Sequence, residues 1–300
     1  MDTLADRPAF TLPIAHGRCL ALGPRTLVMG ILNVTPDSFA GGVTGPDEAA
    51  AAALQMEADG ADLIDIGGES TRPGAADVPE AEELARILPV LQRLQGRLRV
   101  PISVDTYKAG VARAAIAAGA GIVNDISGLG YDPDLGDVVA GTGAGLVLMH
   151  TRGRSREMYR DAHYADVVAE VAAELEEAIA RAVRAGVPRE CLVLDPGIGF
   201  AKQAVHSYAA LAGLPRLQAL GRPLLVGPSR KSFLTAATVP LPPAARDWAT
   251  ASAVAASVLL GAHIVRVHAV ASMAQVVRVA DAIRQQARGS SIRNLFPRSE

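Results

Sequence analysis

The stretch LVMGILNVTPDSFAGG, from Leu27 to Gly42, changes character at its middle. It opens with an apolar run that stops at Asn33 and continues as a loop of polar residues, proline and glycine. A short apolar run bounded by turn residues is typical of a buried β-strand. Seven further runs of this kind follow: DLIDIGG (62–68), ISVDT (102–106), GIVNDI (121–126), AGLVLMH (144–150), CLVLDPG (191–197), PLLVGPS (223–229) and HIVRVH (263–268).

Amphipathic segments rich in alanine separate several of these runs. Their apolar residues recur at helical spacing in residues 47–60, 79–94, 164–186 and 271–288. Glycines stand where helix C-caps are expected before the next strand, at Gly60, Gly119 and Gly186. Strands that are almost continuously apolar indicate a parallel sheet covered on both faces. Eight strand and helix units therefore predict an α/β fold, a (β/α)₈ barrel of the TIM type in a single domain.

A doubly wound open sheet is the alternative architecture. Such a sheet usually carries a phosphate-binding glycine fingerprint after its first strand. The segment GTGAG (141–145) has the wrong spacing and precedes a strand, and GPSRKS (227–232) lacks the second glycine of a Walker A loop. Neither segment is a nucleotide-binding signal, so the barrel is favoured.

The predicted barrel covers most of the 300 residues. We expect it to span residues 27–288, with residues 1–26 as an N-terminal extension that packs on it. Residues 289–300, GSSIRNLFPRSE with Gly289 first, are expected to be a flexible C-terminal tail. Half of all residues are hydrophobic, which is enough for a large core.

The composition gives no sign of a polyanionic partner or a membrane. The formal net charge is −2 and the basic residues are scattered, so we expect no nucleic acid to bind. The first residues lack the apolar core of a signal peptide, and the most apolar segment, residues 249–267, is interrupted by glycine, histidine and arginine. We therefore expect no membrane partner. The cysteines, Cys19 and Cys191, are far apart in sequence, which suits the reducing cytoplasm.

Polar side chains gather at the carboxyl ends of all eight runs. They are Asn33, Glu69, Arg72, Asp105, Asn124, Asp125, His150, Asp195, Ser229, Arg230, Lys231, Arg266 and His268. In a (β/α)₈ barrel these ends share one rim, where active sites form. The rim would bring together residues more than two hundred positions apart. The polar loop after Asn33 would then be a βα loop over the pocket.

A structural role is the alternative for each of these residues. An Asp or Asn after a strand often caps the next helix, which suits Asn124, Asp125 or Asp37 taken alone. Asp105 and Asp195 would lie beside the barrel core, where an unpaired charge is costly, so they need partners. Two basic residues of the rim, Lys231 and Arg266, are candidate counter-charges for these aspartates. A purely structural ion-pair network inside the barrel mouth is therefore an alternative to an active site. His150 is better explained as a hydrogen-bonded structural residue, and no histidine spacing supports zinc.

Eight motifs occur in order at the strand ends: GILNVTPDSF, DIGGESTRPG, ISVDTYK, VNDISG, LMH, LDPGIGFAK, GPSRKSF and RVH. Together they resemble the dihydropteroate synthases of the folate pathway, and the likeness runs from about Gly30 to about Arg284. The resemblance implies an enzyme that joins 6-hydroxymethyl-7,8-dihydropterin pyrophosphate to para-aminobenzoate and releases pyrophosphate with the help of Mg²⁺. It also implies that the protein forms a homodimer and that its other binding partners are the small-molecule substrates.

The resemblance assigns most of the rim residues to parts of this reaction. The pterin would contact Asp105, Asn124, Met149, Asp195, Gly227 and Lys231. One carboxylate, Asp195, can accept the two parallel N–H donors of the pterin edge. The pyrophosphate would contact Asn33, Arg72, Arg266 and His268, and Asn33 would also be the metal contact. Catalysis would rest on Asp105, Lys231 and Arg266, with Asp105 as the carboxylate near the developing cation.

The para-aminobenzoate pocket is implied at Phe39, Thr71, Arg72, Pro73, Phe200, Lys231 and Ser232. Phe200 also has a plausible alternative role in core packing. Two loops, residues 35–45 and 67–76, would close over the bound pterin and exclude water. Closure would protect the pterin cation that the family is thought to form by early loss of pyrophosphate.

Two departures from the family pattern leave other functions open. The loop usually reads Ser-Phe-Ser-Asp-Gly-Gly, but here it reads Ser38-Phe39-Ala40-Gly41-Gly42, and Ala269 stands where Asp commonly follows Arg-Val-His. A pterin-binding relative without synthase activity is one alternative. A barrel enzyme that transfers methyl groups from methyltetrahydrofolate is another, although it needs neither a pyrophosphate cluster nor the Ser-Thr-Arg-Pro loop.

Overall fold

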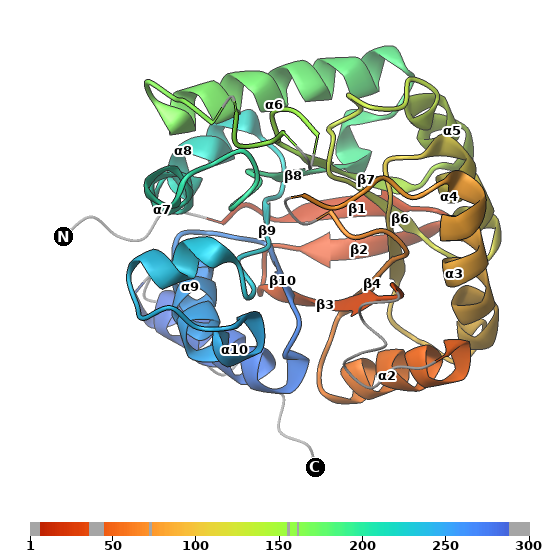
Figure 1. Ribbon diagram of the computed structural model, residues 1–300, viewed down its shortest axis with the longest axis horizontal. Helices are drawn as coiled ribbons and strands as arrows, with labels where there is room; N and C mark the ends of the chain where they lie inside the picture. Colours follow the sequence, from red (N-terminus) through yellow and green to blue (C-terminus); the bar gives the residue numbers. More distant parts are fainter. Residues whose placement is uncertain (1–6, 36–44, 72–73, 155–156, 161, 288–300) are drawn as a thin grey trace.

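Eight parallel strands form the centre of the fold (Figure 1). The computed structural model describes residues 7–35, 45–71, 74–154, 157–160 and 162–287. The barrel strands are β3 (Leu27–Asn33), β4 (Leu63–Gly67), β5 (Ile102–Asp105), β6 (Ile122–Asp125), β7 (Gly145–Met149), β8 (Leu192–Asp195), β9 (Leu225–Val226) and β10 (Ile264–Val267). Each of the eight apolar runs in the sequence contains one of these strands.

The order of the strands makes an almost closed barrel. Hydrogen bonds join them as β8-β7-β6-β5-β4-β3-β10-β9, with parallel pairing throughout. Between β8 and β9 there is one parallel bridge, from Leu194 to Leu224, and the Leu194 amide donates to the Pro223 carbonyl at 2.9 Å. This arrangement confirms the predicted (β/α)₈ barrel and excludes the open doubly wound sheet.

A helix follows each barrel strand and covers the outside of the barrel (Figure 1). The helices are α2 (Pro46–Ala58), α3 (Glu80–Leu94), α4 (Ala109–Ala117), α5 (Leu135–Thr142), α6 (Val167–Arg184), α7 (Ala204–Ala212), α9 (Asp247–Leu259) and α10 (Val270–Ala287). Shorter elements lie in the connections: α8 (Leu214–Leu217), η1 (Arg189–Cys191), η2 (Gln218–Leu220), η3 (Ser232–Ala236) and η4 (Pro243–Ala245). Within the described ranges, no helix combines the length and apolar character needed to span a bilayer.

Alanine lets these helices pack closely against the sheet. The buried faces of α2 and α4 consist largely of alanine, including Ala53 and Ala112, which are fully buried. The three glycines predicted as helix C-caps all adopt positive φ, with Gly60 at +103°, Gly119 at +109° and Gly186 at +86°. Each lies between a helix and the next strand, where the chain must reverse direction. The segment GTGAG spans the end of α5, the short connection and the first residue of β7.

A β-hairpin that sequence patterns did not predict covers the amino-terminal end of the barrel. It consists of β1 (Phe10–Ile14) and β2 (Arg18–Leu22), which pair antiparallel. Leu12, Ile14 and Leu22 pack onto the lowest apolar layer of the barrel. The Ala15 amide also donates to the carbonyl of Gly121, which precedes β6, at 3.1 Å. The hairpin therefore closes the end of the barrel opposite the rim of polar residues. The boundaries of the N-terminal extension and C-terminal tail stay predictions.

Candidate active site

Strand alternation decides which side chains enter the barrel. One interior layer consists of apolar side chains, including Leu63, Ile122, Val147, Val193, Leu225 and Ile264. Successive side chains of a strand point to opposite faces, so the residue two positions further along also points inward. Those residues, one layer nearer the carboxyl ends, are Asp65, Asn124, Met149, Asp195, Gly227 and Arg266. Five of these residues were predicted for the pterin or for catalysis, and they share the layer with Asp65, which was not predicted.

Arg266 on β10 is held between two carboxylates, one from β4 and one from β5. Its Nε donates to Asp65 Oδ2 at 2.6 Å, and its Nη2 donates to Asp105 Oδ2 at 2.6 Å. Asp65 is completely buried and also accepts a 2.9 Å hydrogen bond from the Asn124 side chain. The sequence offered Arg266 as a partner for Asp105 or Asp195, and the structure pairs it with Asp105. Asp65 completes the cluster and fixes both Arg266 and Asn124.

Burial and charge act in opposite directions on this cluster. Burial raises the pKa of Asp105 to about 7, and the nearby Asp65 carboxylate adds to the rise, while Arg266 opposes it. Burial alone would lower the pKa of Arg266, but the two carboxylates hold it above its usual value. One guanidinium thus serves two buried aspartates, which leaves the cluster rich in negative charge.

Asp195 and Lys231, which follows β9, form a second charged group of the mouth. Asp195, at the end of β8, accepts a 2.7 Å hydrogen bond from the Gly197 amide. Burial raises the pKa of Asp195, and Lys231 is the largest opposing influence. Lys231 donates to the Ile198 carbonyl and makes no ion pair within the described part of the chain. Burial lowers the pKa of Lys231 to about 8.

An apolar wall lies beside these charged groups. Tyr107, Ile126 and Met149 form a small buried cluster, against which Tyr131 and Phe200 pack. The Lys231 ammonium lies 4.4 Å from the centre of the Phe200 ring, a cation–π arrangement. Phe200 therefore packs at the mouth, and its contact with para-aminobenzoate stays a prediction. Flat apolar surface next to hydrogen-bonding groups suits an aromatic heterocycle.

His268 follows β10 on the same rim and is positioned by Ser229. The His268 amide donates to Ser229 Oγ at 3.2 Å, and Ser229 Oγ lies 2.9 Å from His268 Nδ1. When the Ser229 hydroxyl donates to Nδ1, the imidazole proton resides on Nε2. Arg230 turns away from the mouth and forms two 2.8 Å hydrogen bonds with Asp247 of α9. Arg230 thus has a structural role, and Ser229 has a role that the sequence did not reveal.

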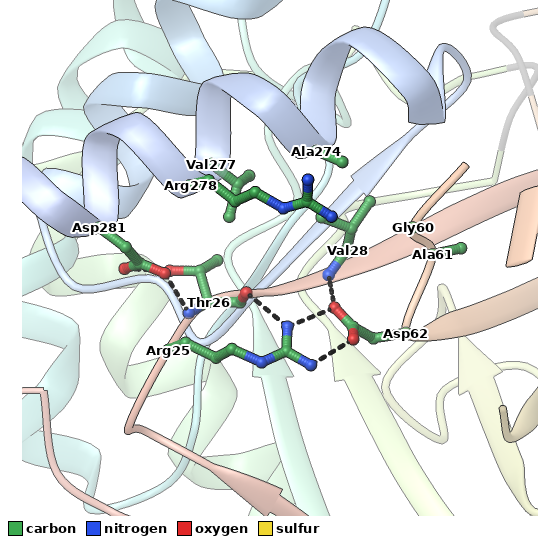
Figure 2. Close-up of a pocket in the computed structure, with 10 residues that line it drawn as sticks. All are labelled: Arg25, Thr26, Val28, Gly60, Ala61, Asp62, Ala274, Val277, Arg278 and Asp281. Carbon is green, nitrogen blue, oxygen red and sulfur yellow. Dashed lines mark hydrogen bonds and ion pairs between the residues drawn. The ribbon is translucent and has the colours of Figure 1, made fainter. Parts of the chain in front are cut away.

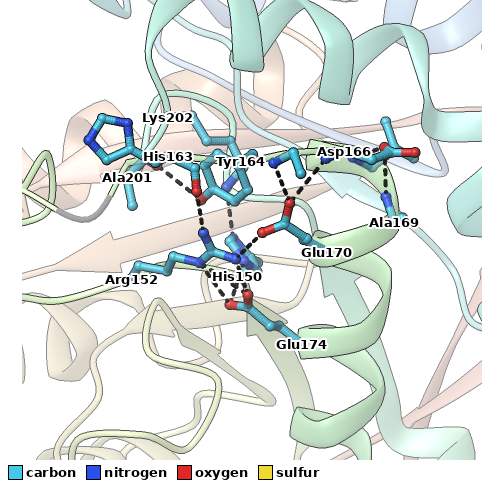
Figure 3. A network of polar contacts seen from close by, with 12 residues as sticks. His150, Arg152, His163, Tyr164, Asp166, Ala169, Glu170, Glu174, Ala201 and Lys202 are labelled. Atoms are coloured by element: carbon cyan, nitrogen blue, oxygen red, sulfur yellow. Dashed lines mark hydrogen bonds and ion pairs between the residues drawn. The ribbon is translucent and has the colours of Figure 1, made fainter.

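A polar network lies behind the β8 end of the mouth (Figure 3). His150 Nε2 pairs with Glu174 of α6 at 2.9 Å, and His150 Nδ1 lies 2.7 Å from Lys202 Nζ. Arg152 contacts Glu174 and donates to Glu170 at 2.8 Å. Burial lowers the pKa of His150 to about 4, although Glu174 opposes the change. These contacts agree with the expected structural role of His150.

Two other rim carboxylates are held by structural contacts. Asp125 accepts hydrogen bonds from the Ser127 amide at 2.7 Å, the Ser127 hydroxyl at 2.6 Å and the Leu129 amide at 2.6 Å. It therefore organises the turn after β6. Glu69 accepts from the Tyr107 hydroxyl at 3.0 Å and pairs with Lys108. The base of the loop after β4 is thereby tied to the end of β5.

Some of the other predicted residues lie within the described ranges of the structure, and others lie outside them. Asn33 ends β3 and is half-buried, Thr71 is half-buried, and Ser232 is exposed at the start of η3. Three predicted residues lie outside the described ranges: Phe39, Arg72 and Pro73. Most of the predicted loop over residues 35–45 lies outside them as well. Their proposed roles stay predictions.

The sequence patterns did not predict the roles of three residues that shape the mouth: Asp65, Ser229 as the hydrogen-bond partner of His268, and Lys202. Asp65 lies inside an apolar run, where it looks like an interruption and not an end. Its spacing of two from Leu63 was the available signal, because that spacing gives both side chains the same face. Lys202 and Ser229 act through contacts between the loops that join strands to helices. The periodicity of a sequence does not reveal such contacts.

A cavity of about 380 Å³ lies at the opposite end of the barrel (Figure 2). Its lining comes from the starts of β3 and β4 and from α10. The two carboxylates that line it are already paired, Asp62 with Arg25 and Asp281 with Arg7. None of the predicted site residues borders this cavity. The carboxyl-end mouth is therefore the better candidate for the active site.

Comparison with known proteins gives one consistent result. A family model described as "Pterin binding enzyme" matches residues 29–268. A dihydropteroate synthase of Synechocystis is 45% identical over 286 residues, covering 94% of this chain and 98% of the relative. A solved dihydropteroate synthase of Xanthomonas albilineans with 4-aminobenzoic acid has a TM-score of 0.84 and 43% identity, covering 91% and 98% of the two chains. A structure of that organism's enzyme with 7,8-dihydropteroate gives a TM-score of 0.81 and 41% identity, with the same coverage.

Proposed function

Because the chain belongs to the family of pterin-binding enzymes, we propose that it acts as a dihydropteroate synthase. It joins 6-hydroxymethyl-7,8-dihydropterin pyrophosphate to para-aminobenzoate, giving 7,8-dihydropteroate and pyrophosphate. The single observation that carries the proposal is the layer of inward-facing Asp65, Asp105, Asn124, Asp195 and Arg266, next to Lys231 and His268. This layer places hydrogen-bonding groups for a heterocycle beside basic groups for a leaving anion.

The Asp195 side of the mouth suits the pterin. A carboxylate can accept the amide N–H and the exocyclic amino N–H of a pterin together. Lys231 can donate to the acceptor edge of the ring, since it faces Asp195 without being paired to it. Asn124 can both donate and accept, and Met149 with Phe200 offers apolar contact to the ring faces. A heterocycle without these groups would leave buried polar atoms unpaired, which favours selectivity.

The Arg266 side suits the pyrophosphate. Two of the guanidinium nitrogens bind carboxylates, whereas Nη1 has no hydrogen-bond partner among the described residues. Nη1 is therefore a donor for a phosphate oxygen, and the two carboxylates fix its direction. His268 Nε2 lies on the same rim and adds a second donor when Ser229 donates to Nδ1. Asn33 and Arg72 are assigned to the same group by resemblance.

The reaction then proceeds by charge stabilisation. The bond between the pterin methylene carbon and the pyrophosphate oxygen breaks, and its electron pair leaves with the pyrophosphate. The amine nitrogen of para-aminobenzoate forms a bond to the same carbon and gives up one proton. Asp105, in its ionised form, lies next to Arg266 and is the carboxylate for the transient positive charge. No nucleophilic side chain takes part.

The second substrate would lie between the mouth and its two loops. Phe200 and Lys231 provide a ring face and a cation, which suit the aromatic ring and carboxylate of para-aminobenzoate. Phe39, Thr71, Arg72, Pro73 and Ser232 would complete the pocket when the loops close. Closure excludes water, which would otherwise compete with the amine.

We also propose Mg²⁺ as the metal. Among the described residues, no group of three His, Cys, Asp or Glu side chains could hold a metal ion. The protein would therefore supply few of the metal ligands. Mg²⁺ commonly binds through substrate phosphates, water and one or two protein oxygens. The amide oxygen of Asn33, at the end of β3, fits that requirement as a single protein ligand. A bound Mg²⁺ would neutralise charge on the departing pyrophosphate, and chelation should lower the rate reversibly.

A homodimer in the cytoplasm completes the proposal. Val279 and Ile283 lie one turn apart on α10 and are 61% and 54% exposed. The helix α10 packs beside α9 (Figure 1). Large apolar side chains at such exposure suit an interface with a second copy. Cys19 and Cys191 are both unpaired, which suits a reducing compartment.

One assay tests the proposed reaction. The protein is mixed with dihydropterin pyrophosphate, para-aminobenzoate and Mg²⁺, and dihydropteroate and pyrophosphate are measured in equal amounts. We expect Arg266→Met to lower the rate by about 10²–10³-fold, because it removes a preorganised donor for the leaving group. Pterin binding without product by the unmodified protein would contradict the proposal and favour a binding-only relative.

A further inference from the structure

Lys202 is an unusual residue in this fold. Its side chain is 2% exposed and is among the largest fully buried side chains. It forms no ion pair with a carboxylate among the described residues. Lysine is almost never fully buried unless it is paired, because loss of water costs free energy. The contacts of its ammonium group therefore need an explanation.

Three acceptors surround the Lys202 ammonium, which has three N–H donors. They are His150 Nδ1 at 2.7 Å and the carbonyls of Gly197 and Phe200, each at 3.2 Å. A protonated lysine requires an acceptor at Nδ1, so the His150 proton lies on Nε2 and is donated to Glu174 at 2.9 Å. Burial lowers the pKa of Lys202 to about 7, whereas Asp195 favours the charged form.

The two carbonyls belong to a tight turn that follows β8. Gly197, Gly199 and Ala201 all have positive φ, at +66°, +79° and +47°. Positive φ is unfavourable for Ala201, so this backbone needs external support. A Cβ on Gly197 would lie 1.9 Å from the His150 carbonyl, which shows how closely the turn approaches β7. Lys202 binds the turn from behind, near both of its ends.

The front of the same turn contacts the pterin side of the mouth. The Gly197 amide donates to Asp195 at 2.7 Å, and the Ile198 carbonyl accepts from Lys231. A Cβ on Gly199 would lie 2.9 Å from Lys231 Cδ, so this glycine admits the lysine side chain. The turn therefore sets the positions of both charged groups assigned to the pterin.

We propose that Lys202 is a positioning residue for the pterin site. Its ammonium, held by His150, fixes the Gly197 and Phe200 carbonyls, and the turn between them fixes Asp195 and Lys231. This inference rests on the proposed function, which supplies the pterin. It assigns Lys202 no contact with substrate.

Binding of pterin-6-carboxylate, a pterin that cannot react, provides the test. Lys202→Met keeps most of the side-chain volume but removes all three donors, and we expect at least a tenfold weaker Kd by fluorescence titration, on the order of one to two lost hydrogen bonds. Lys202→Gln keeps two donors and should restore part of the affinity. Hydrogen exchange of a peptide covering residues 195–203 should be faster in Lys202→Met.

Arg7→Met is the matched control for stability. It removes another buried cation, at the opposite end of the barrel, where Arg7 pairs with Asp281. We expect it to lower Tm as Lys202→Met does, but to change the pterin Kd by less than about twofold, because additivity holds for distant sites. Equal loss of pterin affinity in both variants would overturn the inference. A folded Lys202→Met protein with unchanged pterin affinity would overturn it as well.

A second variant covers the case in which Lys202→Met does not fold. His150→Phe keeps an aromatic ring but removes one acceptor from Lys202, so we expect weaker pterin binding and faster exchange in residues 195–203. Unchanged affinity in this variant would count against the inference. Synthesis of dihydropteroate by the unmodified protein is measured in parallel. Intact pterin binding without synthesis would refute the proposed function, while the binding comparison would still decide the role of Lys202.

Discussion

Lys231 carries a positive charge at the mouth that should be lost at mildly alkaline pH. Burial and Arg266 lower its pKa to about 8, while Asp195 and Asp105 oppose the change. An ordinary lysine stays protonated to about pH 10.4. Only the ammonium form donates to Asp195 or to a pterin acceptor with full charge. We therefore expect kcat/KM for the pterin substrate to fall by about tenfold per pH unit above about pH 8.

Lys231→Arg separates this effect from other titrating groups. A guanidinium keeps its charge throughout this pH range, so the variant should be slower but should lose the alkaline fall in kcat/KM. The measurement is kcat/KM between about pH 6 and pH 10 for both proteins. An identical alkaline fall in the variant would show that another group, such as Lys202, is responsible.

Asp65 should matter through the partners that it holds. Asp65→Ala leaves Arg266 Nε and Asn124 Nδ2 without their acceptor in a buried position, and we expect a loss of about 3–5 kcal/mol in the free energy of unfolding. Asp65→Asn keeps an oxygen acceptor, so its loss should be smaller. Chemical denaturation measures both. Equal stability of the two variants would contradict the role assigned to Asp65.

Sequence information located most of the mouth residues but not their supports. Asp105 and Asp195 were predicted to need a basic partner, Lys231 or Arg266, because a charge at a strand end must be neutralised near the core. Asp65 was missed because it lies within an apolar run, and only its alternation with Leu63 marks it as inward-facing. The Lys202 contacts depend on a turn with three positive φ angles. Such a turn is decided by close packing between connections, which a residue pattern does not encode.

At the scale of elements, the barrel strands were predictable because parallel strands buried on both faces are apolar throughout. The hairpin of β1 and β2 was not, because each strand has five residues and few of them are buried: Leu12 and Ile14 in β1, and Leu22 in β2. The hairpin stabilises the fold through a tertiary contact, because it covers the lowest apolar layer of the barrel.

Leu12→Ala tests this function of the hairpin. Leu12 is completely buried against the interior layer, so truncation leaves a cavity that the barrel cannot easily fill. We expect a loss of about 2–5 kcal/mol in the free energy of unfolding. Thr11→Ala, at an exposed position of the same strand, should change it by less than about 0.5 kcal/mol. Similar values for the two variants would mean that the hairpin contributes little to the core.

At the scale of the whole molecule, the barrel joins residues that are distant in sequence. Asp65 and Arg266 are 201 positions apart and share a 2.6 Å hydrogen bond. Closure of the ring of strands brings them together. The eight strand and helix units in the sequence were enough to predict that closure. The loop after β3 lies largely outside the described residues, so its part in the reaction rests on resemblance.

The proposed homodimer gives a test at the same scale. Changing Val279 and Ile283 together to Glu places two charges in the expected interface on α10, and we expect the mass in solution to fall from twice 31.0 kDa to 31.0 kDa. Val183→Glu is the control, because Val183 is also exposed but lies on α6. Light scattering after size-exclusion chromatography gives the mass. A variant that stays dimeric would place the interface elsewhere.

A crystal structure with dihydropterin pyrophosphate and Mg²⁺ tests the central claim most directly. We predict that the pterin edge lies within hydrogen-bond distance of Asp195 and Lys231, and that the pyrophosphate contacts Arg266 and His268. A pterin bound away from this mouth, or a pyrophosphate that contacts neither of those basic residues, would contradict the account.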